Sequence, residues 1–308
     1  MFRPLHLALA LGLLTTGCIR KFAINKLGDA LAGTGTTFSS DDDPDLVADA
    51  IPFGLKLYES LLAESPRHKG LLLAAATGFT QYSYAFVDQL ADETMTESID
   101  HSNALRARAR RLYLRAHRYG LRGLEVSYPG LGAALEQDPA AALARTRKQD
   151  IPLLYWTAAS HGLAISASKS DPEMIAQLPV VEAILRRVTE LDESWGDGAV
   201  PQFRITIESV QTGLKPAEKQ EHMRQYFERS LQLSKGGLAA PFVSYAENAC
   251  VANQNRAEFK ALLEKALAID ADAHPSDRLA NLVAQRRARW LLSRIDELFL
   301  EETPEKPQ

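Results

Sequence analysis

The chain contains 308 residues, of which 46% are hydrophobic and two are cysteines, and its formal net charge is −4 at pH 7. This length allows one or two domains and an apolar core large enough to be stable without disulfide bonds or bound metal ions. The slightly acidic balance gives no reason to expect nucleic acid as a partner, because nucleic-acid-binding proteins carry a basic face. Two cysteines exclude a disulfide scaffold.

The first predicted element is a secretory signal at residues 1–17, in which an apolar run extends from Leu7 to Leu14. This run is too short to cross a bilayer, which requires about 20 residues. Small residues lead directly to Cys18, as in bacterial lipoprotein signals, so we expect a lipid anchor on this cysteine. An ordinary secretory peptide that contains a cysteine is the alternative. Residue 19 is Ile and not Asp, and the lipoprotein sorting pattern therefore predicts the outer membrane, with the protein facing the periplasm.

After the signal we expect a lipidated N-terminal segment at residues 18–43, a helical domain at 44–300 and a flexible tail at 301–308. In the helical domain apolar residues recur every three or four positions, and β-branched alternation is nearly absent, which predicts an all-α fold. Capped helix starts are predicted at Asp43-Pro44, Asp138-Pro139 and Asp171-Pro172. Helix stops are predicted at Pro66, Pro129 and Gly236-Gly237.

Similar helix endings recur along the domain. The segments 227–234 and 263–270 resemble the second helix of a tetratricopeptide repeat, and their ends lie 36 positions apart. That spacing is close to the unit of about 34 residues in this repeat. The sequence therefore predicts tetratricopeptide-like helical hairpins stacked as a solenoid, a fold that usually offers a concave groove to partners.

No metal-binding, phosphate-binding or nucleophile motif occurs, so neither a metal nor a cofactor is predicted. The acidic run Asp41-Asp42-Asp43 is interpreted as a helix-capping cluster, with a calcium site as the alternative. Cys250 is expected to be a buried small hydrophobic residue. The histidines after the signal share no ligand spacing and are expected among polar neighbours; they are His68, His101, His117, His161, His222 and His274.

Six arginines form a basic helix segment: Arg106, Arg108, Arg110, Arg111, Arg115 and Arg118. Such a segment usually forms a solvated face or salt bridges to neighbouring helices. A site for lipid headgroups or for a partner is the alternative.

Residues 71–87 carry apolar or aromatic side chains around most of the helix circumference, and residues 153–160 do the same. A helix that is apolar all round is buried on several sides, either in the core or along an internal cavity. Because Tyr and Trp combine an apolar body with a polar tip, the alternative to a core is a wall that lines a ligand. The candidate cavity residues are Phe79, Tyr82, Tyr84, Phe86, Tyr155 and Trp156.

Several segments in order resemble the TatT family, the T component associated with tripartite ATP-independent periplasmic (TRAP) transporters. They are the cysteine of the lipoprotein signal and residues 29–35, 40–47, 57–62 and 78–82. The resemblance implies a lipid-anchored, periplasm-facing protein of tetratricopeptide-like hairpins that can assemble as a homotrimer, with an apolar cavity through each subunit. It also implies a partner, the periplasmic solute-binding subunit of the transporter, and an organic-acid or hydrophobic ligand.

The leading hypothesis is therefore a non-enzymatic accessory protein that binds the solute-receptor subunit and holds a small ligand in its helical interior. The alternative is a tetratricopeptide-like lipoprotein scaffold for envelope protein assembly, with no small-molecule ligand. A third hypothesis is an enzyme acting on cell-wall material. It would require paired carboxylates in a cleft, for which the sequence offers Glu182, Glu190 and Asp192 without placing them in one.

Overall fold

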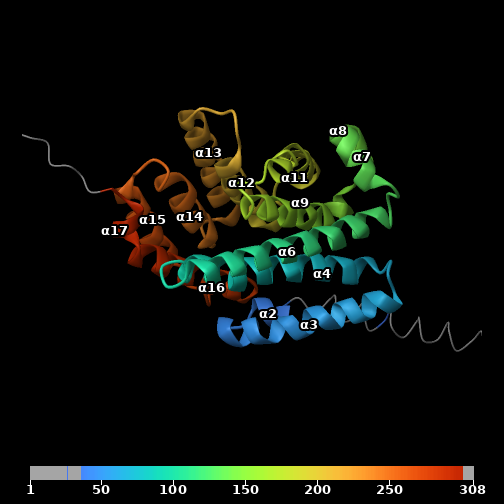
Figure 1. Ribbon diagram of the computed structural model, residues 1–308, viewed down its shortest axis with the longest axis horizontal. Coiled ribbons are helices and arrows are strands. Elements are labelled where there is room, and N and C mark those ends of the chain that lie inside the picture. The colour runs from blue at the N-terminus through green and yellow to red at the C-terminus, as the bar shows by residue number, and fades with distance from the viewer. Residues whose placement is uncertain (1–25, 27–35, 301–308) are drawn as a thin grey trace, which may run out of the picture.

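The computed structural model describes residue 26 and residues 36–300, and within them the chain forms helices and no strand (Figure 1). The all-α prediction is therefore confirmed. Cys18, the predicted signal and the predicted tail lie outside the described residues, so lipid attachment stays a prediction. None of the helices in the described part combines the length and the apolar character needed to span a bilayer.

The first part of the chain forms α2 (Thr36–Ser39), α3 (Pro44–Glu64), α4 (Lys69–Ser83), the π-helix η1 (Tyr84–Asp88), α5 (Gln89–Glu93), α6 (Ile99–Glu125), α7 (Leu131–Gln137) and α8 (Pro139–Leu143). Next come η2 (Lys148–Asp150), α9 (Ile151–Ser166), α10 (Pro172–Ile175), α11 (Leu178–Asp192), η3 (Trp195–Asp197), α12 (Ala199–Val210) and α13 (Pro216–Ser234). The last part forms α14 (Ala240–Tyr245), the π-helix η4 (Ala246–Cys250), α15 (Arg256–Leu267), η5 (Pro275–Asp277), α16 (Arg278–Ser293) and α17 (Ile295–Leu298).

Side-chain caps fix three helix starts where the Asp-Pro pairs predict them. Asp43, Asp138 and Asp171 each accept hydrogen bonds from backbone N–H groups in the first turn of α3, α8 and α10. The following proline has no N–H to leave unpaired at this position. Asp41 accepts the N–H of Asp43 at 2.9 Å, so the acidic run is a capping cluster, as predicted. The short helix α2 just before it was not predicted.

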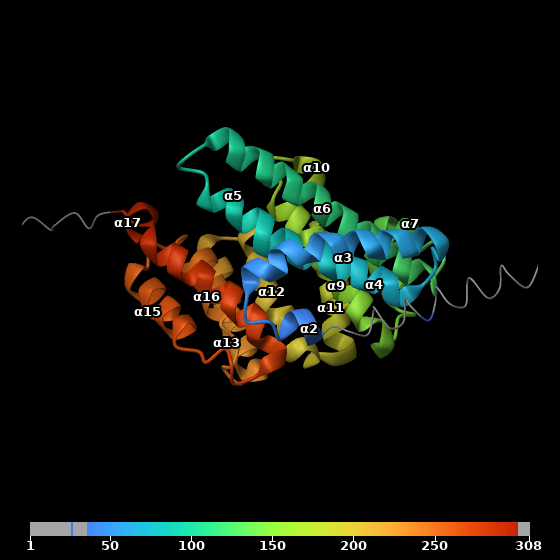
Figure 2. The same cartoon turned by 90° about the horizontal axis from the view of Figure 1, so that it is seen from below.

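The helices stack largely in chain order. α3 packs on α4, α4 on α6, α6 on α9, and α9 on α11 and α12, after which α12 to α16 follow as successive neighbours (Figure 1). α16 then returns to the first helices and contacts α2 and α3 (Figure 2). Its Arg286 pairs with Asp45 at 3.0 Å. The last long helix therefore closes the stack, which local sequence patterns do not predict. The tetratricopeptide-like character of the hairpins stays a prediction.

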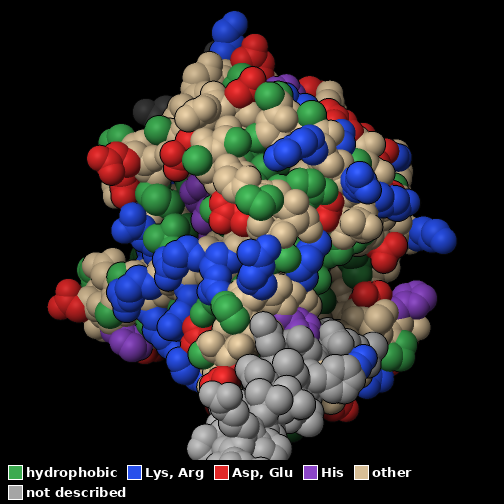
Figure 3. All heavy atoms as spheres, turned by 90° about the vertical axis from the view of Figure 1, so that its right-hand side faces the viewer, with side chains coloured by type: hydrophobic (Ala, Val, Ile, Leu, Met, Phe, Trp, Pro, Cys, Tyr) green, Lys and Arg blue, Asp and Glu red, His purple; other side chains and the backbone are tan. Residues whose placement is uncertain are grey.

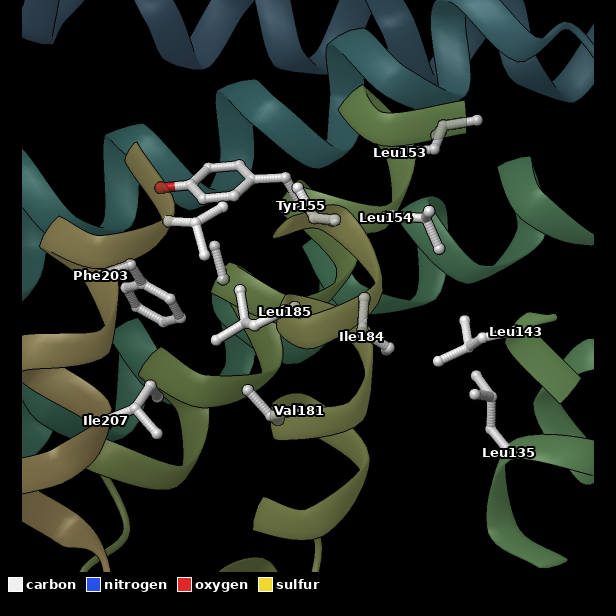
Figure 4. Close-up of a cluster of buried hydrophobic side chains, with 14 of the residues drawn as sticks. Leu135, Leu143, Leu153, Leu154, Tyr155, Val181, Ile184, Leu185, Phe203 and Ile207 are labelled. Atoms are coloured by element: carbon white, nitrogen blue, oxygen red, sulfur yellow. The ribbon is translucent and has the colours of Figure 1, made fainter. Parts of the chain in front are cut away.

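Within the described residues, four separate clusters of buried apolar side chains hold the helices together. The largest lies between α7, α8, α9, α11 and α12 and includes Tyr155 and Phe203 (Figure 4). A second joins α12 to the helices that follow it, a third lies between α3, α4 and α6, and a fourth lies between η1, α5, α6 and α9. Cys250 belongs to the second cluster, and burial raises its pKa to about 12, which confirms its predicted place in the core.

Helices α6 and α9 approach each other closely at Gly120. A Cβ atom on this glycine would lie 3.2 Å from the Cα atom of Thr157. The Thr157 hydroxyl donates to the carbonyl of Leu153 at 2.6 Å, which fixes its rotamer. Because a backbone atom cannot rotate out of the way, only glycine permits this approach.

The same interface brings two histidines together. The ring centroids of His117 and His161 lie 4.2 Å apart where α6 packs on α9, and Nδ1 of His117 lies 3.1 Å from the carbonyl oxygen of Thr157. Burial and the neighbouring His117 lower the pKa of His161 to about 3, and burial also lowers the pKa of His117. The pair was missed because His117 and His161 are 44 positions apart and meet only through helix packing.

Gly120→Ala is expected to lower the free energy of unfolding by about 1–3 kcal/mol, because the added methyl group must push α6 away from the backbone of α9. Urea unfolding followed by circular dichroism measures this loss. The matched control is Gly54→Ala in α3, where a Cβ meets nothing within 4 Å and the higher helix propensity of alanine stabilises by up to about 1 kcal/mol. Equal stability changes in the two variants would contradict the close approach.

Candidate functional site

A polar cavity of about 440 Å³ lies between the first and the last helices of the stack. Its walls come from η1, α5, α6, α9, α12, α14, η4 and α16. Among the described residues that line it, only Leu163 and Ala167 are aliphatic. Three acids and three bases face it, and their formal charges cancel: Asp88, Asp92, Glu247, Arg106, Lys169 and Arg287. A cavity of this volume suits a small molecule.

Two π-helical turns border the cavity, one from each part of the chain. η1 joins α4 to α5 and η4 extends α14, and a backbone hydrogen bond spans five residues in each turn. A π-turn inserts one extra residue into a helix, which changes the direction of the side chains that follow, and such turns are frequent at functional sites. The first turn supplies Tyr84 and Asp88 to the cavity, and the second supplies Glu247 and Asn248.

Arg287 of α16 is the central charge of this site, with a side chain only 5% exposed. Its guanidinium pairs with Asp92 at 2.6 Å and with Glu247, and it stacks on Trp290 at 4.3 Å from the ring centroid. Arg106 also pairs with Asp92, at 2.8 Å. Burial alone would lower the pKa of Arg287, but Glu247 and Asp92 outweigh burial and hold it above its ordinary value. The Nη1 atom of Arg287 is buried without a hydrogen-bond partner.

Asp88 is the carboxyl of the cavity that lacks an ion-pair partner in the described part of the chain. The Tyr113 hydroxyl donates a hydrogen bond to it at 3.0 Å. Burial raises the pKa of Asp88 and the charge of Asp92 adds to this shift, while the bond from Tyr113 and the charges of Arg106 and Arg287 oppose it. Tyr84 also lines the cavity and is 42% exposed. The site therefore holds one carboxyl that a ligand cation can neutralise.

A second, basic site follows α6 on its outer face. Arg108, Arg111, Arg115 and Arg118 line a groove of about 260 Å³ together with Leu112. Spacings of three, four and three residues place the four guanidinium groups along one side of the helix, and we call them the arginine stripe. Lys and Arg side chains also gather in a band on the end of the molecule where α3, α4 and α6 meet α7 and α8 (Figure 3).

Aromatic rings support part of the arginine stripe. Arg108 lies over the ring of Tyr82, and Arg115 lies over Phe79 at 5.1 Å and pairs with Glu59 at 2.9 Å. The predicted salt bridges of the basic segment are confirmed at three positions: Arg106, Arg110 and Arg115. Arg111 and Arg118 form no ion pair within the described residues and are exposed. They leave two unneutralised cations on a rigid helix.

The structure does not bring the six aromatic candidates together. Tyr84 lines the polar cavity. Phe79 is 3% exposed in the cluster of α3, α4 and α6, and Tyr82 contacts both that cluster and Phe86. Tyr155 and Trp156 pack edge to face in the largest core cluster, where Figure 4 shows Tyr155 beside other core side chains. A ligand-contacting role for these residues stays a prediction.

The charged centre of the cavity was missed by sequence reasoning. Asp92 and Arg287 are separated by 195 positions, and no local motif signals their contact. The three carboxylates considered for an enzyme lie elsewhere: Glu182 pairs with Arg204, Glu190 with Arg187 and Asp192 with Lys148. None of the three lines the cavity, and the described residues contain no group of acids, histidines and cysteines that could hold a metal ion.

Comparison with known proteins gives a family match that includes both sites and a similar protein. The model of a protein family described as TRAP transporter T-component matches residues 40–299. A protein of Treponema pallidum (strain Nichols), described as an uncharacterized protein, is 31% identical over 274 residues, which cover 86% of this chain and 83% of the relative.

Arg287→Met is expected to lower the free energy of unfolding by about 2–4 kcal/mol, because Asp92 and Glu247 then share a buried site without their central cation. Urea unfolding measures the effect. Arg256→Met is the control, since Arg256 pairs with Asp296 at the surface and such pairs contribute less than about 1 kcal/mol. A loss no larger than that of the control would show that the ion-pair network does not stabilise the fold.

Proposed function

The chain belongs to the TRAP transporter T-component family, and on this basis we propose that it docks onto the solute-receptor subunit of the transporter and holds a small solute in its central cavity. Family membership itself makes the protein an envelope-associated accessory component of a TRAP transporter. The family match over residues 40–299 is the observation that carries the proposal, since it includes every helix of the cavity and the arginine stripe.

The arginine stripe is the surface we propose for docking. From Arg108 to Arg118 it extends about 15 Å along α6, at about 1.5 Å per residue. Guanidinium groups bind carboxylates through paired hydrogen bonds, and at an interface arginine suits this role better than lysine. The chain as a whole is acidic, so the stripe is a local reversal of charge that would orient a partner. A receptor face with a row of Asp or Glu residues is the complementary surface.

A lipid on Cys18 is the second part of the proposal. Its support is the signal-like segment before this cysteine, which ends in small residues. Anchoring at the inner face of the outer membrane would hold the helical domain in the periplasm, where solute receptors operate. Trimeric assembly, which the family resemblance implies, stays a prediction.

Docking is tested by affinity capture of a TRAP solute-receptor subunit from the same organism, with dissociation constants measured at low and high salt. The native chain is expected to bind, and Arg111→Glu with Arg118→Glu is expected to weaken binding by at least about tenfold, or about 1.4 kcal/mol. The matched control replaces two exposed lysines of α15, Lys260→Glu with Lys265→Glu, which makes the same change in net charge away from the stripe.

Failure of the native chain to bind the receptor would contradict the proposed function. Binding that both double variants weaken equally would leave the function standing and exclude the arginine stripe as the docking surface.

A further inference from the structure

We propose, on the premise that a solute occupies the central cavity, that this solute is a small zwitterion. Its carboxylate is bound on the side of Arg287 and Lys169, and its cationic group is bound by Asp88. Hydroxyl and amide groups from Ser166, Ser170, Thr206 and Asn248 face the space between and suit a polar body.

The side of the cavity that would bind the ligand carboxylate carries two cations, Arg287 and Lys169. Arg287 is held in place by Asp92, Glu247 and the ring of Trp290, yet its Nη1 atom has no acceptor. Arg287 lines the cavity as a fixed positive charge, which would attract the carboxylate of a ligand. Lys169 stands at the exposed rim and forms no ion pair within the described residues. It can meet a carboxylate that enters from solvent.

Asp88 is the group proposed to bind the cationic group of the ligand. The Asp88 carboxyl lines the cavity and receives a hydrogen bond from Tyr113 at 3.0 Å. The charges of Arg106 and Arg287 favour its ionised form, but no lysine or arginine of the described part forms a direct ion pair with it. Burial disfavours the ionised form of this group, and its pKa is raised accordingly. A ligand ammonium beside Asp88 would reverse this effect and gain a charge-assisted hydrogen bond.

The remaining charges argue against other ligand classes. A dicarboxylate would bring two negative charges among Asp88, Asp92 and Glu247, and a diamine would bring two positive charges among Arg106, Lys169 and Arg287. A fatty acid would place its acyl chain against a lining that is more polar than apolar. Because the three acids and three bases cancel, a ligand with one charge of each sign leaves the cavity neutral.

The two π-turns explain how one cavity acquires both signs of charge. Asp88 is the last residue of η1, and Glu247 lies in η4, where it fixes Arg287 from the opposite wall. Each turn redirects a helix so that its polar residues face the cavity while its apolar residues pack in a neighbouring cluster, as Val87 and Cys250 do.

The test is isothermal titration calorimetry of the helical domain with its N-terminal segment, using the common amino acids and glycine betaine as zwitterionic probes. Succinate, putrescine and decanoate represent the dianion, the dication and the acyl chain. We expect at least one zwitterion to bind at millimolar or lower concentration, more tightly than the other three. Asp88→Asn keeps the shape of the side chain and its acceptor for Tyr113, and it is expected to weaken that binding by about tenfold or more.

Lys169→Gln is expected to weaken the same binding and cannot disrupt the core, because Lys169 is exposed. Its control is Lys260→Gln on α15, which should bind as the native chain does. Absence of binding by every zwitterion, tighter binding of succinate, putrescine or decanoate, or indifference to both cavity variants would overturn the assignment. Receptor capture is measured separately, so a chain that captures the receptor but binds no zwitterion contradicts this inference alone, and the converse contradicts the docking proposal alone.

Discussion

The guanidinium group of Arg287 is buried between helices from opposite parts of the chain, and its charge has to be balanced where it lies. Asp92 comes from α5, Glu247 comes from η4, and Asp92 is 195 positions away from the arginine it neutralises. These ion pairs require α5, η4 and α16 to meet at one point. The return of α16 to α2 and α3 brings them there and closes the stack of hairpins (Figure 2).

The ion pairs of Arg287 also restrict where apolar side chains can pack. In the part of the chain that the structure describes, the buried apolar residues form four separate clusters, and none of them fills the cavity. Three of the four adjoin it through α5, α9, α12 or η4. Because of the two π-turns, α4–α5 and α14 each place apolar side chains in a core cluster and polar side chains in the cavity. The apolar clusters therefore surround the polar cavity. The arginine stripe lies apart from it, on the outer side of α6, where a partner can reach it.

Local features of this fold could be predicted from the sequence, because caps and helix faces depend on nearby residues. The Asp-Pro helix starts, the burial of Cys250 and the ion pairs of the basic segment were correctly predicted. The π-turns, the His117–His161 contact and the Arg287 network were not, since each depends on how distant helices pack. Phe79 and Tyr155 were predicted as cavity residues because they are aromatic, but both pack in core clusters. The residues that line the cavity are polar and belong to no recognisable sequence motif.

Hydrogen–deuterium exchange with and without a bound zwitterion tests the central claim most directly, that one solute site joins the two parts of the chain through the Arg287 network. Binding should slow exchange in residues 84–93 and in residues 244–251 together, because Asp88 contacts the solute from one wall and Glu247 holds Arg287 from the other. Slower exchange confined to one of these segments, or located instead along α3 and α4, would contradict it.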